Sequence, residues 1–364
     1  MVKKTVAVAM SGGVDSSLSA ILLQQQGFNV FGVTMKLWDY ADVGAGINTN
    51  SGCCNINLIE GARAVCAKYN IPHHVLNLSE DFKESVIADF VEEYKKGRTP
   101  NPCVVCNTRI KWDLLLDKVR SMGADFLATG HYAQVEFYPK SGRWVLKKGL
   151  DQKRDQSYFL WGLDQESLSR TLFPIGKMTK KRVRQLAREY GLRTAENPES
   201  REICFVTDNN YRRFLRDYAK LEPKPGPIID EEGNEVGEHN GVQNYTVGQR
   251  RGLNIALGEP VYVKKIDPEN NTIQVARAEN IKASSFIVND MNWVSIPEPG
   301  KIINCMVKIR YTPREFSVKL DVLQDHECEV SLSEPVASIT PGQSAVFYNQ
   351  DVVLSGGIIK EVKV

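Results

Sequence analysis

Short apolar runs alternate with amphipathic segments over the first half of the chain. Runs with the length of a buried strand lie at residues 5–10, 29–35, 73–78 and 125–133. Segments with helical periodicity lie at residues 16–27, 57–70, 81–97 and 111–123. This alternation predicts an α/β fold with a doubly wound parallel sheet from about residue 3 to about residue 197.

The ends of these predicted strands indicate where a ligand binds. In an open parallel sheet, ligands bind outside the carboxyl ends of the strands. The loops that follow Met10, Met35 and Gly130 are therefore expected to share one site.

The pattern changes after about Asp208. Residues 221–241 are rich in Pro and Gly, which predicts a small module of strands and turns. From about Ser284, short β-branched segments separated by turns predict a closed antiparallel β-barrel. We therefore expect a catalytic domain at 1–207, a small central module at 208–283 and a C-terminal β-barrel at 284–364.

Composition places the chain in an ordinary class. Its hydrophobic content is 42% and its charged content 25%, and no run approaches a membrane span. Eight cysteines, unevenly placed, favour reduced thiols over a disulfide scaffold, so we expect a cytoplasmic protein.

The net charge of +2 hides an uneven distribution. Between Lys140 and Lys220 there are 19 Lys and Arg against 10 Asp and Glu, a local charge of +9. A basic middle favours a polyanion as partner. The alternative is a solvated helix face over "KKRVRQLAREYGL", where the basic residues only maintain solubility.

The segment "AMSGGVDSS" follows a strand and opens a helix, so its backbone N–H groups are expected to meet an anion. It lacks the Gly-Lys-Ser/Thr of a Walker A loop and the spacing G-x-G-x-x-G. Asp15 beside phosphates makes sense when a divalent cation bridges them. The alternative is a tight turn capped by serines.

Two cysteines stand three apart in "NPCVVCN", just before a predicted helix. The residues alone leave three interpretations of Cys103 and Cys106 open: a zinc half-site, a redox pair, or a single catalytic cysteine beside one without a catalytic role. Cys204, in "SREICFV", has apolar neighbours that suit a buried structural cysteine.

Several motifs carry a resemblance to a known family. "SGGVDSS" resembles the PP-loop of the ATP pyrophosphatase superfamily, and "TPNPCVVCN", "LATGHYA", "RDQSYFLWGL", "RTLFPIG", "SREICFV" and "YTVGQRRGL" resemble the tRNA-specific 2-thiouridylases. The resemblance implies ATP- and Mg²⁺-dependent placement of sulfur on C2 of the wobble uridine, with release of AMP and pyrophosphate. It implies tRNAs for Lys, Glu and Gln as substrates, a cysteine desulfurase or sulfur relay protein as persulfide donor, and no membrane partner.

The resemblance also assigns roles by position. It implies catalytic roles for Cys106, Cys204 and Asp15. It places ATP against Ala9, Met10, Ser11, Gly12, Gly13, Val14, Asp15, Ser16, Ser17, Met35 and Gly130. It places tRNA against Asn101, Pro102, Cys103, Arg154, Asp155, Gln156, Arg310 and Tyr311.

The chain departs from the family pattern at two of these positions. Arg154 stands where Lys is common, which conserves charge, and Cys103 stands where many members carry Asp. Three interpretations of Cys103 remain open: a harmless substitute, a zinc half-site completed by Cys53 and Cys54, or a [4Fe–4S] cluster on Cys103, Cys106 and Cys204.

Other functions share part of the pattern. A PP-loop synthetase of a small molecule would share the glycine loop but needs no paired thiols and no basic middle. A different tRNA-sulfur enzyme would share the thiols but not the order of the motifs. A non-catalytic RNA-binding module would leave the nucleotide loop unexplained.

Overall fold

The structure is a computed structural model that describes residues 3–38, 56–196, 203–300, 302–323 and 326–363. Its first part holds β1 (Thr5–Ala9), α1 (Val14–Gln25), β2 (Asn29–Lys36), α3 (Ile56–Lys68), β3 (His73–Asn77), α4 (Ser79–Phe82), α5 (Ala88–Lys95), α6 (Pro102–Val105), α7 (Leu116–Ser121), β4 (Phe126–Ala128), β5 (Ala133–Tyr138), β6 (Arg143–Lys148), α8 (Gln165–Ser169), β7 (Thr171–Leu172), α9 (Lys180–Glu189) and α10 (Tyr211–Asp217). The strands of the second part are β8 (Gly226–Ile229), β9 (Glu235–His239), β10 (Val261–Asp267), β11 (Thr272–Arg277), β12 (Lys282–Asn292), β13 (Ile303–Lys308), β14 (Phe316–Val322), β15 (Cys328–Ala337), β16 (Ser344–Asn349) and β17 (Val352–Lys363).

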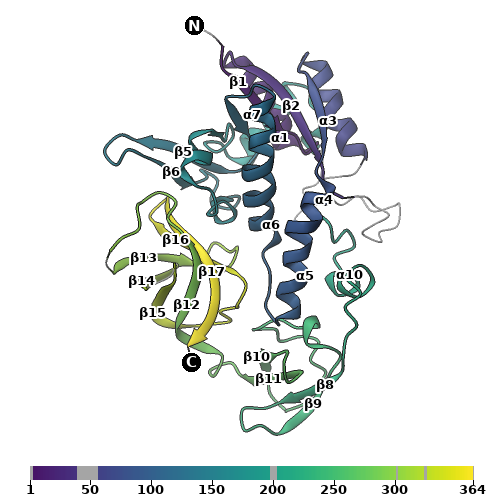
Figure 1. The fold of residues 1–364 in the computed structure, drawn as a ribbon, viewed down its shortest axis with the longest axis vertical. Coiled ribbons are helices and arrows are strands. Elements are labelled where there is room, and N and C mark those ends of the chain that lie inside the picture. The colour runs from purple at the N-terminus through teal and green to yellow at the C-terminus, as the bar shows by residue number, and fades with distance from the viewer. Residues whose placement is uncertain (1–2, 39–55, 197–202, 301, 324–325, 364) are drawn as a thin grey trace.

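The first part is built on a parallel sheet in the order β3-β2-β1-β4-β7 (Figure 1). Successive β1 residues point to opposite faces. Ala7 packs under the helix that contains Trp112, whereas Val6 and Val8 pack under α1, α3 and α9. The chain order reverses between β1 and β4, which is the switch point where such sheets bind ligands. The predicted fold class is confirmed.

Two helices differ from the prediction. The helix expected at 111–123 already begins at Pro102, and a π-helical stretch, Cys106–Leu115, joins α6 to α7. A shorter π-helical turn, Lys83–Ile87, joins α4 to α5. Proline is favoured at the first helical position, so the "NPCVVC" segment starts the helix instead of preceding it. Cys106 is thus a helical residue, on a segment type that is frequent at functional sites.

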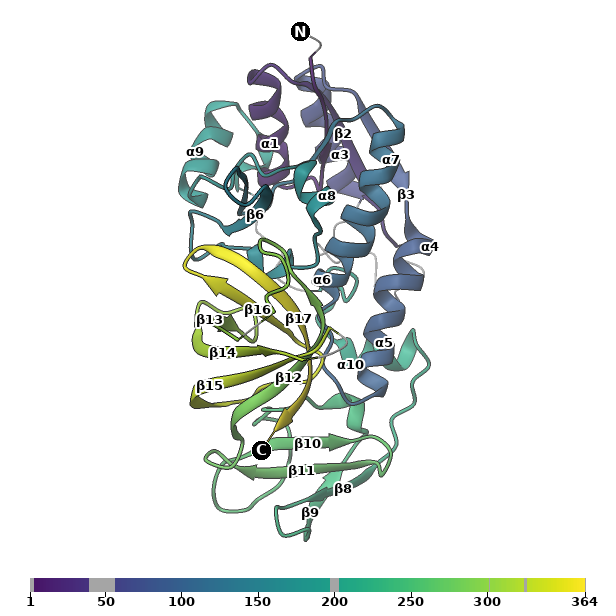
Figure 2. The ribbon, with the colours of Figure 1, turned by 60° about the vertical axis from the view of Figure 1, so that its left-hand side comes forward.

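The C-terminal strands form a closed antiparallel barrel in the order β12-β15-β14-β13-β16-β17, closed by pairing of β12 with β17 (Figure 2). The β5–β6 hairpin, which precedes the barrel by over a hundred residues, extends the same sheet through β6 and β17. The sequence pattern did not predict this hairpin or the short strand β7.

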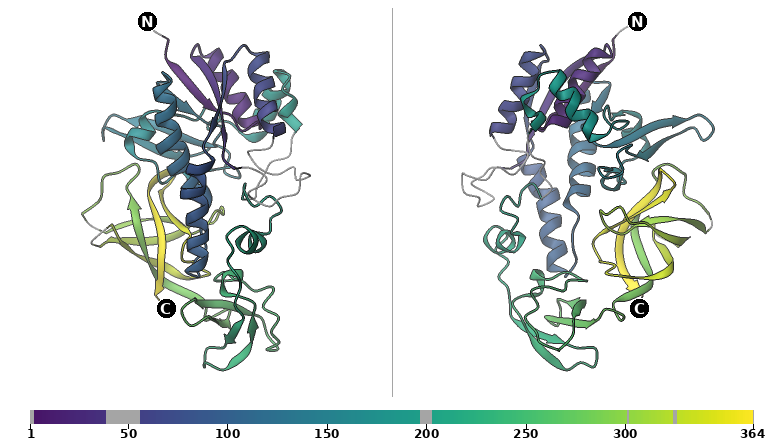
Figure 3. Two further views of the ribbon diagram at one scale, coloured as in Figure 1. Left: turned by 45° about the vertical axis from the view of Figure 1, so that its right-hand side comes forward. Right: turned by 180° about the vertical axis from the view of Figure 1, so that it is seen from behind.

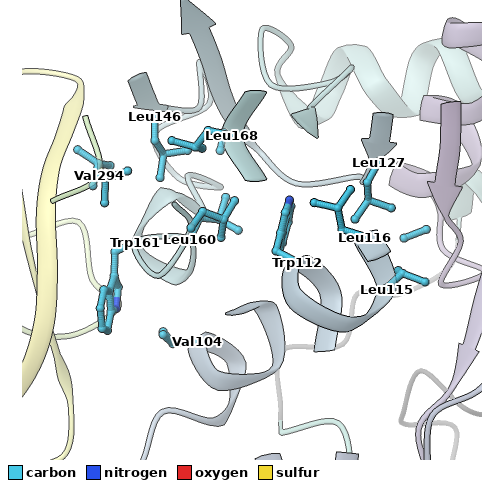
Figure 4. Close-up of a cluster of buried hydrophobic side chains, with 14 of the residues drawn as sticks. Val104, Trp112, Leu115, Leu116, Leu127, Leu146, Leu160, Trp161, Leu168 and Val294 are labelled. Atoms are coloured by element: carbon cyan, nitrogen blue, oxygen red, sulfur yellow. The ribbon is translucent and has the colours of Figure 1, made fainter. Parts of the chain in front are cut away.

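The parallel sheet and the barrel share one hydrophobic core. Trp112, Leu160 and Trp161 from the first part pack with Val294, Val346 and Tyr348 from the barrel region (Figure 4). A Cβ at Gly356 of β17 would lie 2.5 Å from the Trp161 ring, so glycine permits this close approach. The barrel is therefore docked rigidly on the first part.

The central module is a sheet in the order β10-β11-β8-β9 with a small core of its own. The helix α10 lies beside α5 and above this sheet (Figure 3). Phe214 of α10 packs with Phe90 of α5 in a cluster that also contains Cys106.

Candidate active site

The loop between β1 and α1 leaves its polar groups available to a ligand. Gly12 has φ of +73°, and a Cβ there would collide with the backbone of Leu58. Gly13 occupies the N-cap of α1, and no side chain caps the helix. The hydroxyl of Ser17 is buried and has no hydrogen-bond partner among the described residues. Uncapped N–H groups and an orphaned buried hydroxyl fit the oxygens of a phosphate.

The loops after β1, β2 and β4 meet here, as the sequence predicts. The N–H of Met10 donates to the Val33 carbonyl at 2.8 Å, and the Thr34 hydroxyl donates to the Met10 carbonyl at 3.0 Å. A Cβ at Gly130 would lie 2.7 Å from the Ser16 nitrogen, so only glycine fits. Met35, at the end of β2, is half-buried against two core clusters.

Asp15 has two partners that the sequence did not reveal. The Lys180 ammonium lies 2.9 and 2.7 Å from its two carboxylate oxygens, and the Tyr132 hydroxyl donates to it at 2.8 Å. The Lys180 side chain is only 10% exposed. A lysine in the first turn of a helix opposes the helix dipole, so the position of Lys180 at the start of α9 is a signal in the sequence, whereas its burial is known only from the structure.

The two thiols of the resemblance lie in one hydrophobic cluster. Cys106 is buried within it and Cys204 is half-buried against it, although 98 positions separate them in the chain. The Phe205 ring joins the sides of this cluster, with centroids 5.2 Å from the rings of both Phe90 and Phe214. The fold thus places both cysteines on one hydrophobic cluster that is rich in aromatic rings.

Cys103 behaves differently, because its side chain is exposed. Among the residues that the structure describes, no group of three or more His, Cys, Asp or Glu side chains is placed to hold a metal ion. The [4Fe–4S] interpretation of Cys103, Cys106 and Cys204 stays a prediction, which the iron and acid-labile sulfide content of the protein would test. Cys53 and Cys54 lie outside the described residues.

Residues expected to contact RNA converge between α6 and the barrel. Asn101 is the N-cap residue of α6. The Tyr158 hydroxyl donates to the Ser344 carbonyl of the barrel at 3.0 Å, and the Tyr311 ring centroid lies 4.4 Å from that of Phe159. Arg310 donates to the Ser338 carbonyl, and Tyr311 is 49% exposed. Three segments far apart in sequence thus build one surface with an exposed aromatic ring and a guanidinium.

Two further side chains hold this surface together and were missed. Gln343 of the barrel donates to the carbonyls of Thr99 and Pro100 at 3.0 and 2.9 Å. Asn107 donates to the Phe159 carbonyl at 2.9 Å. No local sequence signal distinguishes such long-range contacts.

The segment 154–156 is only partly on this surface. Pro102 is buried at the start of α6, and Arg154 and Gln156 are half-buried. Gln156 accepts the Tyr132 N–H at 2.9 Å. The Asp155 carboxylate is 3% exposed and accepts hydrogen bonds from within the protein, so its side chain points inward.

His131, next to Gly130, lies between the rings of Trp112 and Phe173, with centroids 5.8 and 5.9 Å away. Its Nδ1 lies 2.7 Å from the Thr129 hydroxyl. Burial, and then the charge of Lys111, hold the pKa of the imidazole well below its ordinary value. His131 is therefore a neutral, packed residue near pH 7.

In the described ranges no helix combines the length and the apolar character that crossing a bilayer requires.

Three family models match consecutive parts of the chain. The tRNA methyl transferase HUP domain matches residues 4–208, the tRNA methyl transferase PRC-barrel domain residues 212–277, and the aminomethyltransferase beta-barrel domain residues 283–359. Together these models follow the parallel sheet, the central module and the barrel in order.

Individual relatives match along almost their whole length. The chain is 48% identical to the tRNA-specific 2-thiouridylase MnmA of Halothermothrix orenii, covering 98% of this chain and 99% of that protein. It is 44% identical to the MnmA protein of Acetivibrio thermocellus, covering 99% and 100%. A solved 4-thiouridine synthetase–RNA complex with bound ATP aligns over 60% of this chain and 51% of its own at 16% identity, with a TM-score of 0.37, too low to compare sites.

Proposed function

This chain belongs to the tRNA-specific 2-thiouridylase family, and on that premise we propose how its own residues replace O2 of a wobble uridine by sulfur. The observation that carries the proposal is the combination of an uncapped nucleotide loop with two thiols on one aromatic cluster. Neither feature alone distinguishes this reaction from those of other PP-loop enzymes.

ATP is the first ligand of the site. We propose that Ala9, Met10, Ser11, Gly12, Gly13, Val14, Asp15, Ser16 and Ser17 surround its phosphates, with Met35 and Gly130 beside the nucleoside. The orphaned Ser17 hydroxyl and the free α1 N–H groups support this placement. Asp15 would hold Mg²⁺ through lone pairs that Lys180 and Tyr132 leave open, and Lys180 brings a positive charge to the same carboxylate.

The first step makes the uridine oxygen a leaving group. O2 of the uridine attacks the α-phosphorus of ATP, the bond to pyrophosphate breaks, and the base carries AMP on O2. Charge develops on the departing pyrophosphate, where Lys180, Mg²⁺ and the helix N-terminus would stabilise it.

The second step delivers sulfur. A donor protein leaves a persulfide on Cys204, whose terminal sulfur attacks C2 and expels AMP with the original oxygen. Cys106 as thiolate then attacks Sγ of Cys204, so that a Cys106–Cys204 disulfide forms and the uridine keeps the sulfur. A dithiol reductant restores both thiols. Their shared cluster supports this exchange.

RNA recognition would use the surface between α6 and the barrel. We propose that Asn101, Pro102 and Cys103 approach the target base, and that Arg154, Gln156, Arg310 and Tyr311 hold the anticodon loop. A guanidinium binds phosphate and an exposed tyrosine stacks on an unpaired base. Selection of tRNAs for Lys, Glu and Gln and a desulfurase or relay donor remain predictions from the resemblance. A cytoplasmic setting and the boundaries at 207/208 and 283/284 remain predictions from the sequence pattern and composition.

The thiol mechanism is tested with single serine variants. Cys106→Ser and Cys204→Ser are each expected to abolish 2-thiouridine formation, while tRNA binding and tRNA-dependent pyrophosphate release persist. Cys103→Ala is the matched control: Cys103 is proposed to approach the base but has no part in sulfur transfer, so the variant should retain thiolation within a few fold at saturating tRNA. Near wild-type thiolation in either serine variant would contradict the two-thiol mechanism.

The same preparations, made without oxygen, are assayed for iron and acid-labile sulfide. About four irons per chain, lost in Cys103→Ala, would instead support a cluster. The rival synthetase of a small molecule is excluded if tRNA, and no metabolite, stimulates pyrophosphate release.

A further inference from the structure

A buried group of charges joins the first part of the chain to the barrel. Asp155 accepts the Lys308 ammonium at 3.1 Å, and their side chains are 2% and 7% exposed. Lys308 also lies 3.7 Å from Glu315, which accepts a hydrogen bond from Lys148, itself 8% exposed. We call Asp155, Lys308, Glu315 and Lys148 the interdomain charge cluster.

The ring of Tyr348 closes this cluster from one side. It lies 4.5 Å from the Lys148 ammonium and 5.0 Å from that of Lys308, and Tyr348 is fully buried. Its hydroxyl lies 3.2 Å from the Ser157 hydroxyl, which donates to Asp155 at 3.1 Å. Two carboxylates, two ammoniums and an aromatic face thus neutralise each other away from water, which is the condition under which buried charges are tolerated.

Asp155 also fixes the backbone of its own segment. Its Oδ1 accepts the N–H groups of Gly149 and Ser157, both at 3.1 Å. The carboxylate therefore holds the turn that presents Arg154 and Gln156 on either side of it. Because the Asp155 side chain binds groups inside the protein, it is buried although its neighbours Arg154 and Gln156 are expected to contact RNA.

Lys308 does the same for the barrel. It ends β13, and Arg310 and Tyr311 follow two and three residues later. The Tyr311 ring contacts Phe159, four residues after Asp155. The Asp155–Lys308 ion pair thus joins the two segments of the proposed RNA surface, residues 154–156 and residues 310–311.

We propose that Asp155 and Lys308 are positioning residues for RNA recognition: the buried pair fixes the 154–156 segment relative to Arg310 and Tyr311, and neither side chain contacts RNA. The proposal rests on the proposed function, because it assumes that these segments bind tRNA. Glu315 and Lys148 extend the same fixation to the loop before β14 and the end of β6.

The test compares Lys308→Met with Arg310→Ala, using tRNA affinity measured at several salt concentrations. A lost phosphate contact lowers the slope of log affinity against log salt by about one. Arg310→Ala is expected to weaken binding and lower that slope. Lys308→Met is expected to weaken binding by about tenfold to a hundredfold through misplacement of the surface. It should lower the slope by no more than Arg310→Ala does, because its effect runs through the Arg310 contact.

Three further variants complete the design. Lys319→Met removes an exposed lysine of β14 and should bind tRNA like the wild type. Asp155→Asn, which keeps the shape of the side chain, should reproduce the effect of Lys308→Met if the latter folds poorly. Combining Lys308→Met with Arg310→Ala should cost less than the sum of the two, because the Arg310 contact is already impaired.

The results separate the two proposals. A further fall in the salt slope when Lys308→Met is added to Arg310→Ala, with additive losses of affinity, would show a direct phosphate contact of Lys308 and overturn the positioning role. Affinity within twofold of the wild type in folded Lys308→Met and Asp155→Asn would overturn it as well. Failure of the wild type itself to bind tRNA or to form 2-thiouridine would refute the proposed function instead.

Discussion

At the residue scale, the carboxylate of Asp15 shows what a motif conveys and what it omits. The glycine loop predicts an acidic group beside phosphates, and the structure gives that group two partners, Lys180 and Tyr132. Lys180 begins α9, 165 positions away, and reaches Asp15 because α9 packs beside α1. The buried Lys180 ammonium is placed to stabilise the negative charge that would develop on the departing pyrophosphate.

Loss of this ammonium should therefore reduce adenylation and leave RNA binding alone. Lys180→Met is expected to lower tRNA-dependent pyrophosphate release by about a hundredfold or more, the usual cost of removing one transition-state donor. The measurement is single-turnover pyrophosphate release with saturating tRNA. Lys181→Met, an exposed neighbour on the same helix, is the control. Equal rates in both variants would remove Lys180 from the mechanism.

At the element scale, patterns predicted the strands better than the helix ends. Apolar runs placed β1, β2 and β4, whose residues are mostly buried, and also β3, a largely exposed strand at the edge of the sheet. The helix that carries Cys106, however, begins nine residues before the periodic stretch. Pro102, at the first helical position, favours that start, which periodicity does not report. The β5–β6 hairpin was missed because its partner strand, β17, lies about two hundred residues later.

Packing between elements also sets a pH dependence at His131, which lies after β4 between Trp112 and Phe173. Burial lowers the pKa of the folded imidazole, so the folded protein binds this proton less readily than the unfolded chain. The contribution of His131 to the free energy of unfolding is complete above the ordinary pKa of about 6.5. It decreases as the pH falls below that value, by up to about 1.4 kcal/mol per pH unit.

Denaturant unfolding between about pH 7 and pH 5.5 measures this effect. His131→Gln, which retains an acceptor for Thr129, should lose less stability over that range than the wild type. His73, whose pKa burial also lowers, is present in both proteins and cancels. Identical slopes would mean that His131 does not titrate below its ordinary range.

At the scale of the whole molecule, the sequence predicted three successive units but not the contacts that join them. The barrel shares a core with the parallel sheet through Trp161 and Tyr348, and the interdomain charge cluster adds a polar junction. Neither feature follows from periodicity, since the ion pair joins residues 153 positions apart and the shared core joins residues still further apart. The cysteines were assigned by resemblance, and their roles stay a prediction; in the fold both lie on one hydrophobic cluster.

The central claim is that ATP activates the uridine oxygen that sulfur then replaces. We would prepare a tRNA with ¹⁸O at C2 of the wobble uridine and run a single turnover with ATP and a persulfide donor. The ¹⁸O content of the AMP would then be measured by mass spectrometry. The account predicts one AMP per 2-thiouridine formed, with the ¹⁸O on its phosphate. Thiolated tRNA accompanied by unlabelled AMP, with the ¹⁸O in water, would contradict it.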